Sequence, residues 1–224
     1  MDIIKANNIN HSYIFAQREI KSLYDISFKI EKGEFISIVG MNGCGKSTLV
    51  KHLNALIPLQ SGELTIASLD CRNNKNIYKI RQKCGMVFQN PDNQIVTDKV
   101  WHELSFGLEN LGVPQNVIRR RVGEMASYFG IQDWFRKKTD ELSGGQKQLL
   151  NLASVMVMQP KVLILDEPTS QLDPIAAADF IATLKKLNTE FGITVLLVEH
   201  RLEDVFPIAD KVLLMENGCV LLYD

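Results

Sequence analysis

The residues with the clearest chemical meaning are eight consecutive positions, Gly40–Ser47, which read GMNGCGKS. The spacing G-x-x-x-x-G-K-S is typical of a phosphate-binding loop between a strand and a helix. Its glycines let successive amides turn toward phosphate oxygens, and the dipole of the following helix adds to the attraction. Lys46 supplies a positive charge for the β and γ phosphates, and the Ser47 hydroxyl can ligate Mg²⁺. The candidate nucleotide-binding residues here are Gly40, Asn42, Gly43, Cys44, Gly45, Lys46, Ser47 and Thr48, the last as a donor to the α phosphate.

A second chemical pair follows the apolar run Val162–Leu165, where Asp166 and Glu167 are adjacent. Two acids at the end of a strand are commonly a solvated edge or a helix cap. Beside a phosphate-binding loop, however, they predict that Asp166 holds Mg²⁺ through water. Glu167, one residue further on, would polarise the attacking water as a general base or by orienting it.

A third element, Leu142–Gln146, reads LSGGQ and precedes an apolar helical pattern. Ser143 is predicted to cap that helix, and Gly144 and Gly145 expose backbone amides. The segment therefore predicts a second helix terminus that binds anions.

The elements that must position these residues alternate between strand and helix. Continuous apolar runs separated by helical segments indicate a parallel sheet covered on both faces. A glycine turn at Asn217-Gly218 predicts a closing hairpin. The predicted strands are 26–30, 35–39, 162–165, 194–198, 211–215 and 219–223, and the predicted helical segments are 47–56, several between 100 and 158, and 174–190.

Composition excludes several classes of protein. The 224 residues are 46% hydrophobic and 23% charged, as in soluble globular chains. The net charge of -1 gives no general attraction to nucleic acid or anionic lipid, so no nucleic-acid partner is expected. Four scattered cysteines indicate neither a disulfide framework nor a zinc site and fit a reducing compartment. No stretch reaches the apolar length of a membrane span, and no secretory leader is evident.

The pentapeptide LSGGQ makes the sequence resemble the ATP-binding cassette (ABC) ATPases, whose signature it is, and the other family motifs follow in order over the whole chain. By this resemblance Tyr13 stacks on adenine, although Phe15 and Tyr24 are nearby competitors. Gln89 is the Q-loop glutamine that reaches Mg²⁺ and the water. His200 is the histidine that contacts the γ phosphate, 34 residues after Asp166 and so predicted to share its crevice.

The resemblance also implies the fold and the assembly. The expected architecture is a P-loop NTPase α/β core with a mainly parallel sheet, an N-terminal antiparallel β subdomain and an inserted helical subdomain. The single domain 1–224 would divide into a core of 1–89 and 160–224 and a helical part of about 90–159. Two subunits would sandwich ATP head to tail, with the signature and the D-loop reaching the partner's nucleotide. The residues acting across that interface would be Ser143, Gly144, Gly145, Gln146 and Asp173, and Asp173 also reads as a helix cap before Pro174.

The segments 87–94 and 106–114 resemble the ATPase subunits of energy-coupling factor transporters, which import vitamins or transition-metal ions. This resemblance implies an ATP-hydrolysing motor on the cytoplasmic face of a prokaryotic-type cell membrane. Its partners would be an identical or paralogous ATPase, a transmembrane coupling component and a small substrate-binding membrane protein. Catalysis would fall to Glu167, His200, Gln89 and Lys46, and Mg²⁺ would be held by Ser47, Gln89 and Asp166.

Several departures and alternatives stay open at this point. Leu149 stands where the family commonly has arginine, Gln171 where it more often has alanine, and Glu199 where threonine is commoner. The chain ends just after the final predicted hairpin, so a shortened chain or one cassette of a tandem protein is an alternative. A soluble ABC switch acting on translation or nucleic acid is compatible with the same ATP site. A P-loop kinase is disfavoured because the signature has no role there, and a GTPase because no N-K-x-D segment is present.

Overall fold

The structure is a computed structural model that describes residues 1–16, 18–200 and 202–223. Its strands are β1 (Asp2–Phe15), β2 (Arg18–Glu31), β3 (Phe35–Gly40), β4 (Ser61–Ile66), β5 (Leu69–Asp70), β6 (Cys84–Val87), β7 (Val162–Asp166), β8 (Thr194–Val198), β9 (Lys211–Glu216) and β10 (Cys219–Tyr223). Its helices are α1 (Lys46–Leu53), α2 (Asn74–Lys83), α3 (Val100–Asn110), α4 (Gln115–Phe129), α5 (Gly144–Val157), α6 (Pro174–Phe191) and α7 (Leu202–Val205), with short 3₁₀ turns at Pro91–Asn93, Gln132–Trp134 and Thr139–Glu141.

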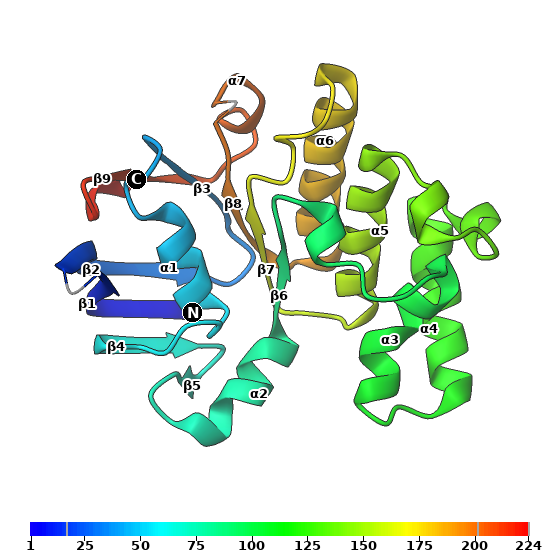
Figure 1. The fold of residues 1–224 in the computed structure, drawn as a ribbon, viewed down its shortest axis with the longest axis horizontal. Helices are drawn as coiled ribbons and strands as arrows, with labels where there is room; N and C mark the ends of the chain where they lie inside the picture. Colours follow the sequence, from blue (N-terminus) through cyan, green and yellow to red (C-terminus); the bar gives the residue numbers. More distant parts are fainter. Residues whose placement is uncertain (17, 201, 224) are drawn as a thin grey trace.

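The strands form two sheets (Figure 1). The larger sheet has the order β10-β9-β3-β8-β7-β6, and its neighbours pair in parallel except for the antiparallel β9–β10 hairpin. The smaller sheet, β2-β1-β4-β5, is antiparallel throughout. The predicted α/β class, the mainly parallel sheet, the antiparallel N-terminal sheet and the closing hairpin are thereby confirmed.

The two faces of the larger sheet are buried under different helices. Along β7 and β8, successive side chains point to opposite faces, as the two-residue period of a strand requires. Ile164 and Leu196 belong to the core that contains α1, whereas Leu163 and Leu197 belong to the core beneath α5 and α6. Helix α1 and helix α5 therefore cover opposite faces of the sheet, as Figure 1 also shows.

A third apolar cluster lies away from the sheet, among α3, α4 and α5. Its members are Val100, Leu104, Leu108, Ile118, Val122, Ala126, Ile131, Leu142, Leu150, Ala153 and Val157. Leu149 packs against this cluster. Within the described residues, no helix is both long and apolar enough to cross a lipid bilayer.

The predicted end of the first helix is wrong. The apolar spacing predicts a helix to Leu56, but α1 ends at Leu53. Ala55 takes a left-handed φ of 54°, which stops the helical hydrogen-bond pattern. The Asn54 side chain donates from Nδ2 to the Cys84 carbonyl at 2.6 Å and so ties the helix end to β6.

Candidate functional site

The phosphate-binding loop follows β3 and leads directly into α1, as the sequence predicts. Two of its glycines are required by close packing. A Cβ atom at Gly40 would lie 2.2 Å from the Met215 carbonyl oxygen, and one at Gly45 would lie 2.6 Å from the Ser22 carbonyl oxygen. Gly45 also takes a φ of 105°, which side-chain-bearing residues rarely adopt. Gly43 has a φ of 78° with open space around it, so backbone conformation rather than crowding calls for glycine there.

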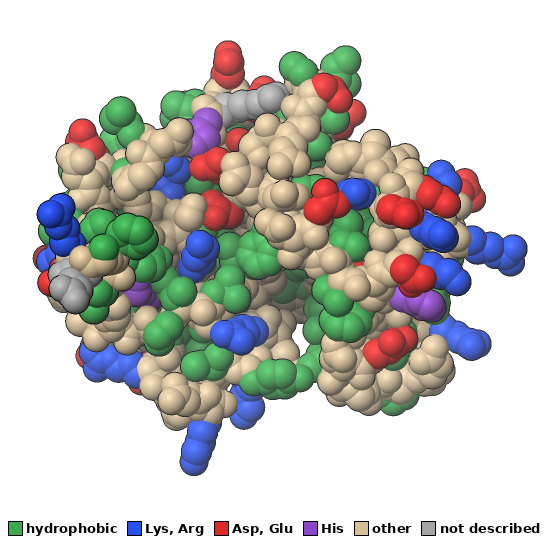
Figure 2. Space-filling model, viewed as in Figure 1, with side chains coloured by type: hydrophobic (Ala, Val, Ile, Leu, Met, Phe, Trp, Pro, Cys, Tyr) green, Lys and Arg blue, Asp and Glu red, His purple; other side chains and the backbone are tan. Residues whose placement is uncertain are grey.

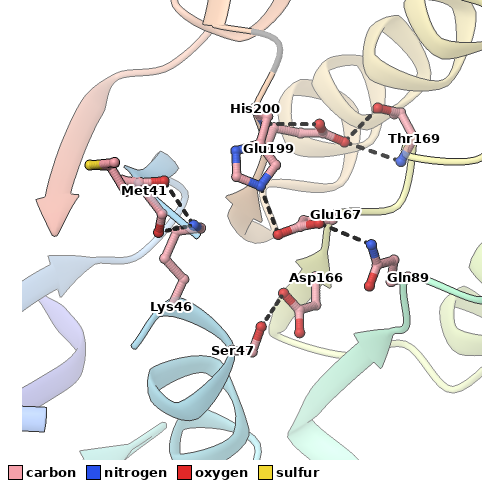
Figure 3. A network of polar contacts seen from close by, with 10 residues as sticks. Met41, Lys46, Ser47, Gln89, Asp166, Glu167, Thr169, Glu199 and His200 are labelled. Carbon is pink, nitrogen blue, oxygen red and sulfur yellow. Dashed lines mark hydrogen bonds and ion pairs between the residues drawn. The ribbon is translucent and has the colours of Figure 1, made fainter. Parts of the chain in front are cut away.

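Lys46 lies in the first turn of α1 and is almost fully buried. Its Nζ donates to the carbonyl oxygens of Gly40 and Met41 at 2.8 and 3.0 Å, which folds the side chain back along the loop (Figure 3). The cationic group is therefore held at the loop's own backbone, where a phosphate of a bound nucleotide would meet it.

Ser47 and Asp166 meet across the carboxyl-terminal edge of the larger sheet. The Ser47 hydroxyl donates to Asp166 Oδ1 at 3.2 Å, although 119 positions separate the two residues. Burial raises the pKa of the Asp166 carboxyl above its ordinary value, the Ser47 hydrogen bond opposes this, and the neighbouring Glu167 carboxylate adds to it. A divalent cation at this point would favour the ionised carboxylate by its charge.

Glu167 is at the centre of the polar network. Its Oε1 lies 2.9 Å from His200 Nε2, and its Oε2 accepts a hydrogen bond from Gln89 Nε2 at 3.0 Å (Figure 3). The three residues follow β7, β8 and β6, which are adjacent parallel strands. The carboxyl ends of adjacent parallel strands form the crevice in which α/β proteins bind their ligands.

The backbone of Glu167 is strained. Its φ is 49°, in the left-handed region that costs a non-glycine residue about 1–3 kcal/mol. The Glu167 amide donates to the Val198 carbonyl at 3.0 Å, which holds the conformation from the neighbouring strand. Backbone strain of this kind clusters at functional sites, where it aims a side chain.

The segment that carries Gln89 is held by the helix that follows the signature. Gln148 donates to the Phe88 carbonyl at 3.0 Å, and Asn151 donates to the Pro91 carbonyl at 3.1 Å. Both amide side chains are buried on α5. Two side-chain hydrogen bonds therefore join α5 to the Gln89 segment.

Tyr13 lies beside the first turn of α1. Its hydroxyl lies 3.3 Å from Thr48 Oγ1, which also accepts a hydrogen bond from the Ser22 hydroxyl at 2.9 Å. The ring is 41% exposed, as a ring that stacks on a base must be. The competitor Phe15 is 74% exposed near the hairpin tip, and no contact ties it to the loop among the described residues.

The signature residues lie apart from this network. Ser143 caps α5: its Oγ accepts from the Gln146 amide at 3.3 Å, and the Gln146 side chain accepts from the Ser143 amide at 3.0 Å. Gly144 is exposed and Gly145 half-buried. Asp173 caps α6 by accepting from the amides of the second and third helical residues at 3.0 Å each. The predicted caps at Ser143 and Asp173 are confirmed.

The structure thus brings together Lys46, Ser47, Gln89, Asp166, Glu167 and His200, and leaves Ser143, Gly144, Gly145, Gln146 and Asp173 at the starts of helices that cover the sheet's other face. Sequence reasoning did not assign roles to Ser22, Gln148 or Asn151. Gln148 and Asn151 are polar positions within an apolar helical pattern, and that was the available signal.

The residues present fit a nucleoside triphosphate with Mg²⁺. Gly43 has open space where a Cβ atom would lie, and Ser47 with Asp166 offers the oxygen ligands that Mg²⁺ takes in such sites. Within the described ranges, no group of three or more His, Cys, Asp or Glu side chains is arranged to hold a metal by itself. A cation that shares its coordination with substrate phosphates needs only one or two protein carboxylates.

The chain belongs to the ABC transporter family, whose sequence profile matches residues 23–170. Nucleotide binding follows from this membership. The chain is 45% identical over 98% of its length to an energy-coupling factor transporter ATP-binding protein of Caldanaerobacter subterraneus, of which it covers 79%. It is 47% identical to an ABC transporter ATP-binding protein of Bacillus cereus, but spans only 41% of that protein's length.

Solved structures agree with this assignment. The cbiO1 protein of Clostridium perfringens, part of the ABC transporter complex cbiONQ, superposes with a TM-score of 0.89 at 36% identity. That match covers 99% of this chain and 88% of the other. An ATP-binding cassette in a dimeric, post-hydrolysis state with ADP and phosphate gives a TM-score of 0.88 at 27% identity, covering 99% and 97% of the two chains.

Proposed function

We propose that this chain is the ATP-binding and ATP-hydrolysing motor of a membrane importer of the energy-coupling factor type, for a vitamin or a transition-metal ion. The observation that carries the proposal is the placement of Glu167 between His200 and Gln89, beside the Ser47–Asp166 pair. A site of this kind needs positioned charges and a positioned water rather than a covalent nucleophile.

Each residue of the site has a chemical task in this proposal. Lys46 exchanges its carbonyl partners for β- and γ-phosphate oxygens, and the amides of Gly43 and Gly45 contact the phosphates. Tyr13 stacks on the base, and Thr48 donates to the α phosphate. Glu167 accepts a proton from the attacking water, while Gln89 and His200 hold the carboxylate and approach the water and the γ phosphate.

Mg²⁺, when bound, neutralises charge on the β and γ phosphates. Ser47 and Asp166 are the proposed protein ligands, with Gln89 reaching the ion from the segment that follows β6. Asp166 must be ionised for this purpose, and the raised pKa of its carboxyl makes that ionisation dependent on the cation.

The placement of the signature supports a site shared by two subunits. Helix α1 and helix α5 cover opposite faces of one sheet, so Ser143 caps a helix on the face away from the phosphate-binding loop. A nucleotide on the loop of one subunit would meet Ser143, Gly144, Gly145 and Gln146 of another, with Asp173 close to the same interface. ATP would then stabilise the closed dimer, and loss of the γ phosphate would release it.

The proposed division of labour within the chain follows the same lines. Residues 1–89 and 160–224 would form the nucleotide-binding core, and about 90–159 the helical part that carries the signature. Gln148 would link the two parts, because its side chain on α5 donates to the Phe88 carbonyl next to Gln89.

The importer assignment rests on similarity to energy-coupling factor ATP-binding proteins. By that similarity the partners are a second ATPase, a transmembrane coupling component and a small substrate-binding membrane protein, with this chain peripheral at the cytoplasmic face. The alternative, a soluble switch acting on translation or nucleic acid, draws no support from the named relatives or from the net charge of -1. On the face that Figure 2 shows, the Lys and Arg side chains of the described residues are spread over the surface and form no single continuous patch.

The shared site can be tested by mixing two inactive variants. Lys46→Ala disables the phosphate loop, and Ser143→Arg blocks the signature. In a mixed dimer one of the two sites combines an intact loop with an intact signature. Equal mixing should therefore restore about a quarter of wild-type hydrolysis, because half of the dimers are mixed and each has one intact site. Hydrolysis that stays at the level of the separate variants would contradict a site shared by two copies of this chain.

A further inference from the structure

Glu199 is a buried carboxylate immediately behind the candidate site. Glu199 is only 3% exposed, although it lies between the end of β8 and His200, whose side chain is exposed. Its Oε1 accepts from the Thr169 amide at 3.1 Å and from the Thr169 hydroxyl at 2.6 Å. Its Oε2 accepts from the His200 amide at 3.2 Å (Figure 3).

These three hydrogen bonds join two segments of the chain. One segment contains Glu167, the other contains His200, and these two side chains contact each other. Thr169 follows Glu167 by two residues, and His200 follows Glu199 directly. Thr169 is itself fully buried, so its amide and hydroxyl need an acceptor inside the protein. Glu199 supplies that acceptor with one oxygen and fixes the His200 backbone with the other.

The chemistry of the side chain explains why a carboxylate serves here. A threonine hydroxyl offers one oxygen on a short side chain, whereas two carboxylate oxygens reach donors on both segments at once. Hydrogen bonds to an ionised acceptor are also stronger than those to a neutral one. The strained φ of Glu167 persists only if the surrounding structure holds the backbone in place. Glu199 contributes to this because it fixes Thr169, two residues after Glu167.

We propose that Glu199 is a positioning residue, which holds Glu167 and His200 at their working separation through Thr169 and the His200 backbone. It does not touch the reacting atoms. The inference rests on the proposed ATPase function, and the experiment below separates the two.

The test compares Glu199→Ala, Glu199→Gln and Thr169→Val with the wild type and with Glu203→Gln as a control, because Glu203 is an exposed acid on the adjoining helix. In Glu199→Gln one carboxylate oxygen is replaced by an NH₂ group. If the remaining oxygen accepts from Thr169, the NH₂ group faces the His200 N–H; if the side chain is flipped, the NH₂ group faces Thr169. Thr169→Val removes only the hydroxyl donor. The readouts are kcat and KM for Mg-ATP, affinity for a fluorescent ATP analogue, and amide hydrogen exchange of the peptides containing Thr169 and His200.

Glu199→Ala should lower kcat about tenfold or more while the KM for ATP and the analogue affinity change by less than about twofold, because misplacement of a catalytic group costs rate rather than binding. Amide exchange should accelerate in the peptides with Thr169 and His200. Glu199→Gln and Thr169→Val should be intermediate, and the double variant Thr169→Val/Glu199→Ala should be no slower than Glu199→Ala alone.

Three results would overturn the inference: a kcat of Glu199→Ala equal to that of Glu203→Gln, unchanged exchange at the Thr169 amide, or fully additive losses in the double variant. Failure of the proposed function looks different. In that case the wild type would hydrolyse no more ATP than Glu167→Gln, while the exchange data would still report whether Glu199 holds the two segments.

Discussion

Replacement of Glu167 by glutamine removes the negative charge of the side chain and keeps its size and shape. The carboxylate lies 2.9 Å from His200 Nε2 and 3.0 Å from Gln89 Nε2, both of which are donors when the carboxylate is ionised. Glutamine keeps one oxygen acceptor for His200 but presents an NH₂ group to the Gln89 amide, which can rotate to offer its own oxygen. The network can therefore re-form, and the loss is confined to proton acceptance.

The expected magnitude follows from this geometry. General base catalysis by a positioned side chain is worth about 10²–10⁴-fold in rate. Each tenfold corresponds to about 1.4 kcal/mol of barrier, so the variant should lose about 3–5 kcal/mol of transition-state stabilisation. Phosphate binding by the glycine loop and Lys46 does not involve Glu167, and ATP affinity should stay within about twofold of wild type.

The assay is steady-state phosphate release with saturating Mg-ATP, accompanied by analogue titration and by light scattering of the protein with and without ATP. Glu109→Gln, at an exposed acid on α3, is the matched control. We expect normal affinity, loss of most turnover and an ATP-dependent dimer that persists in Glu167→Gln alone. A kcat within about threefold of the control would show that Glu167 is not the base, and weakened ATP binding would show that the network does not re-form.

Three further predictions concern stability and reactivity. Because the φ of Glu167 is 49°, Glu167→Gly should melt about 2–4 °C above Glu167→Ala with equal loss of ATPase, and an equal melting temperature would argue against backbone strain there. The rings of His11 and His52 are 4.7 Å apart, and burial lowers the pKa of both below 6.5. The free energy of unfolding should therefore be highest above pH 6.5 and should decrease as the pH falls through the lowered pKa values. A His52→Gln variant should melt with a weaker pH dependence between pH 7 and 5, and parallel curves would contradict this. Burial raises the pKa of the Cys71 thiol to about 12, so an alkylating reagent at pH 8 should label the partly exposed Cys219 first and Cys71 only after unfolding, an order that mass spectrometry would detect.

Much of the fold follows from local sequence. The apolar runs Val162–Leu165 and Thr194–Val198 are buried parallel strands because helices cover both faces of the sheet, and the Asn217-Gly218 turn closes the predicted hairpin. The end of α1 was not predictable from spacing, because Leu56 continues the apolar pattern. The left-handed φ of Ala55 ends the helix, and a hydrogen bond from the Asn54 side chain ties this end to a distant strand.

The site shows the same division between local and non-local information. Gly40–Ser47 and Asp166-Glu167 carry their chemistry in adjacent residues, so residue type and spacing predict them. Glu199 could be noticed only as an unusual residue before His200, since its partner Thr169 is 30 positions away and comes near it only through strand pairing. Pairing of β7 with β8 therefore creates a contact that no local pattern contains.

Affinity isolation of this chain, in its full natural length, from native membranes tests the central claim most directly. The account predicts that a multi-span membrane protein and a small substrate-binding membrane protein copurify with it, together with a second ATPase subunit. Recovery of ribosomes or nucleic acid without those membrane proteins would contradict the importer assignment, and would leave the ATP-hydrolysing site to serve a soluble switch.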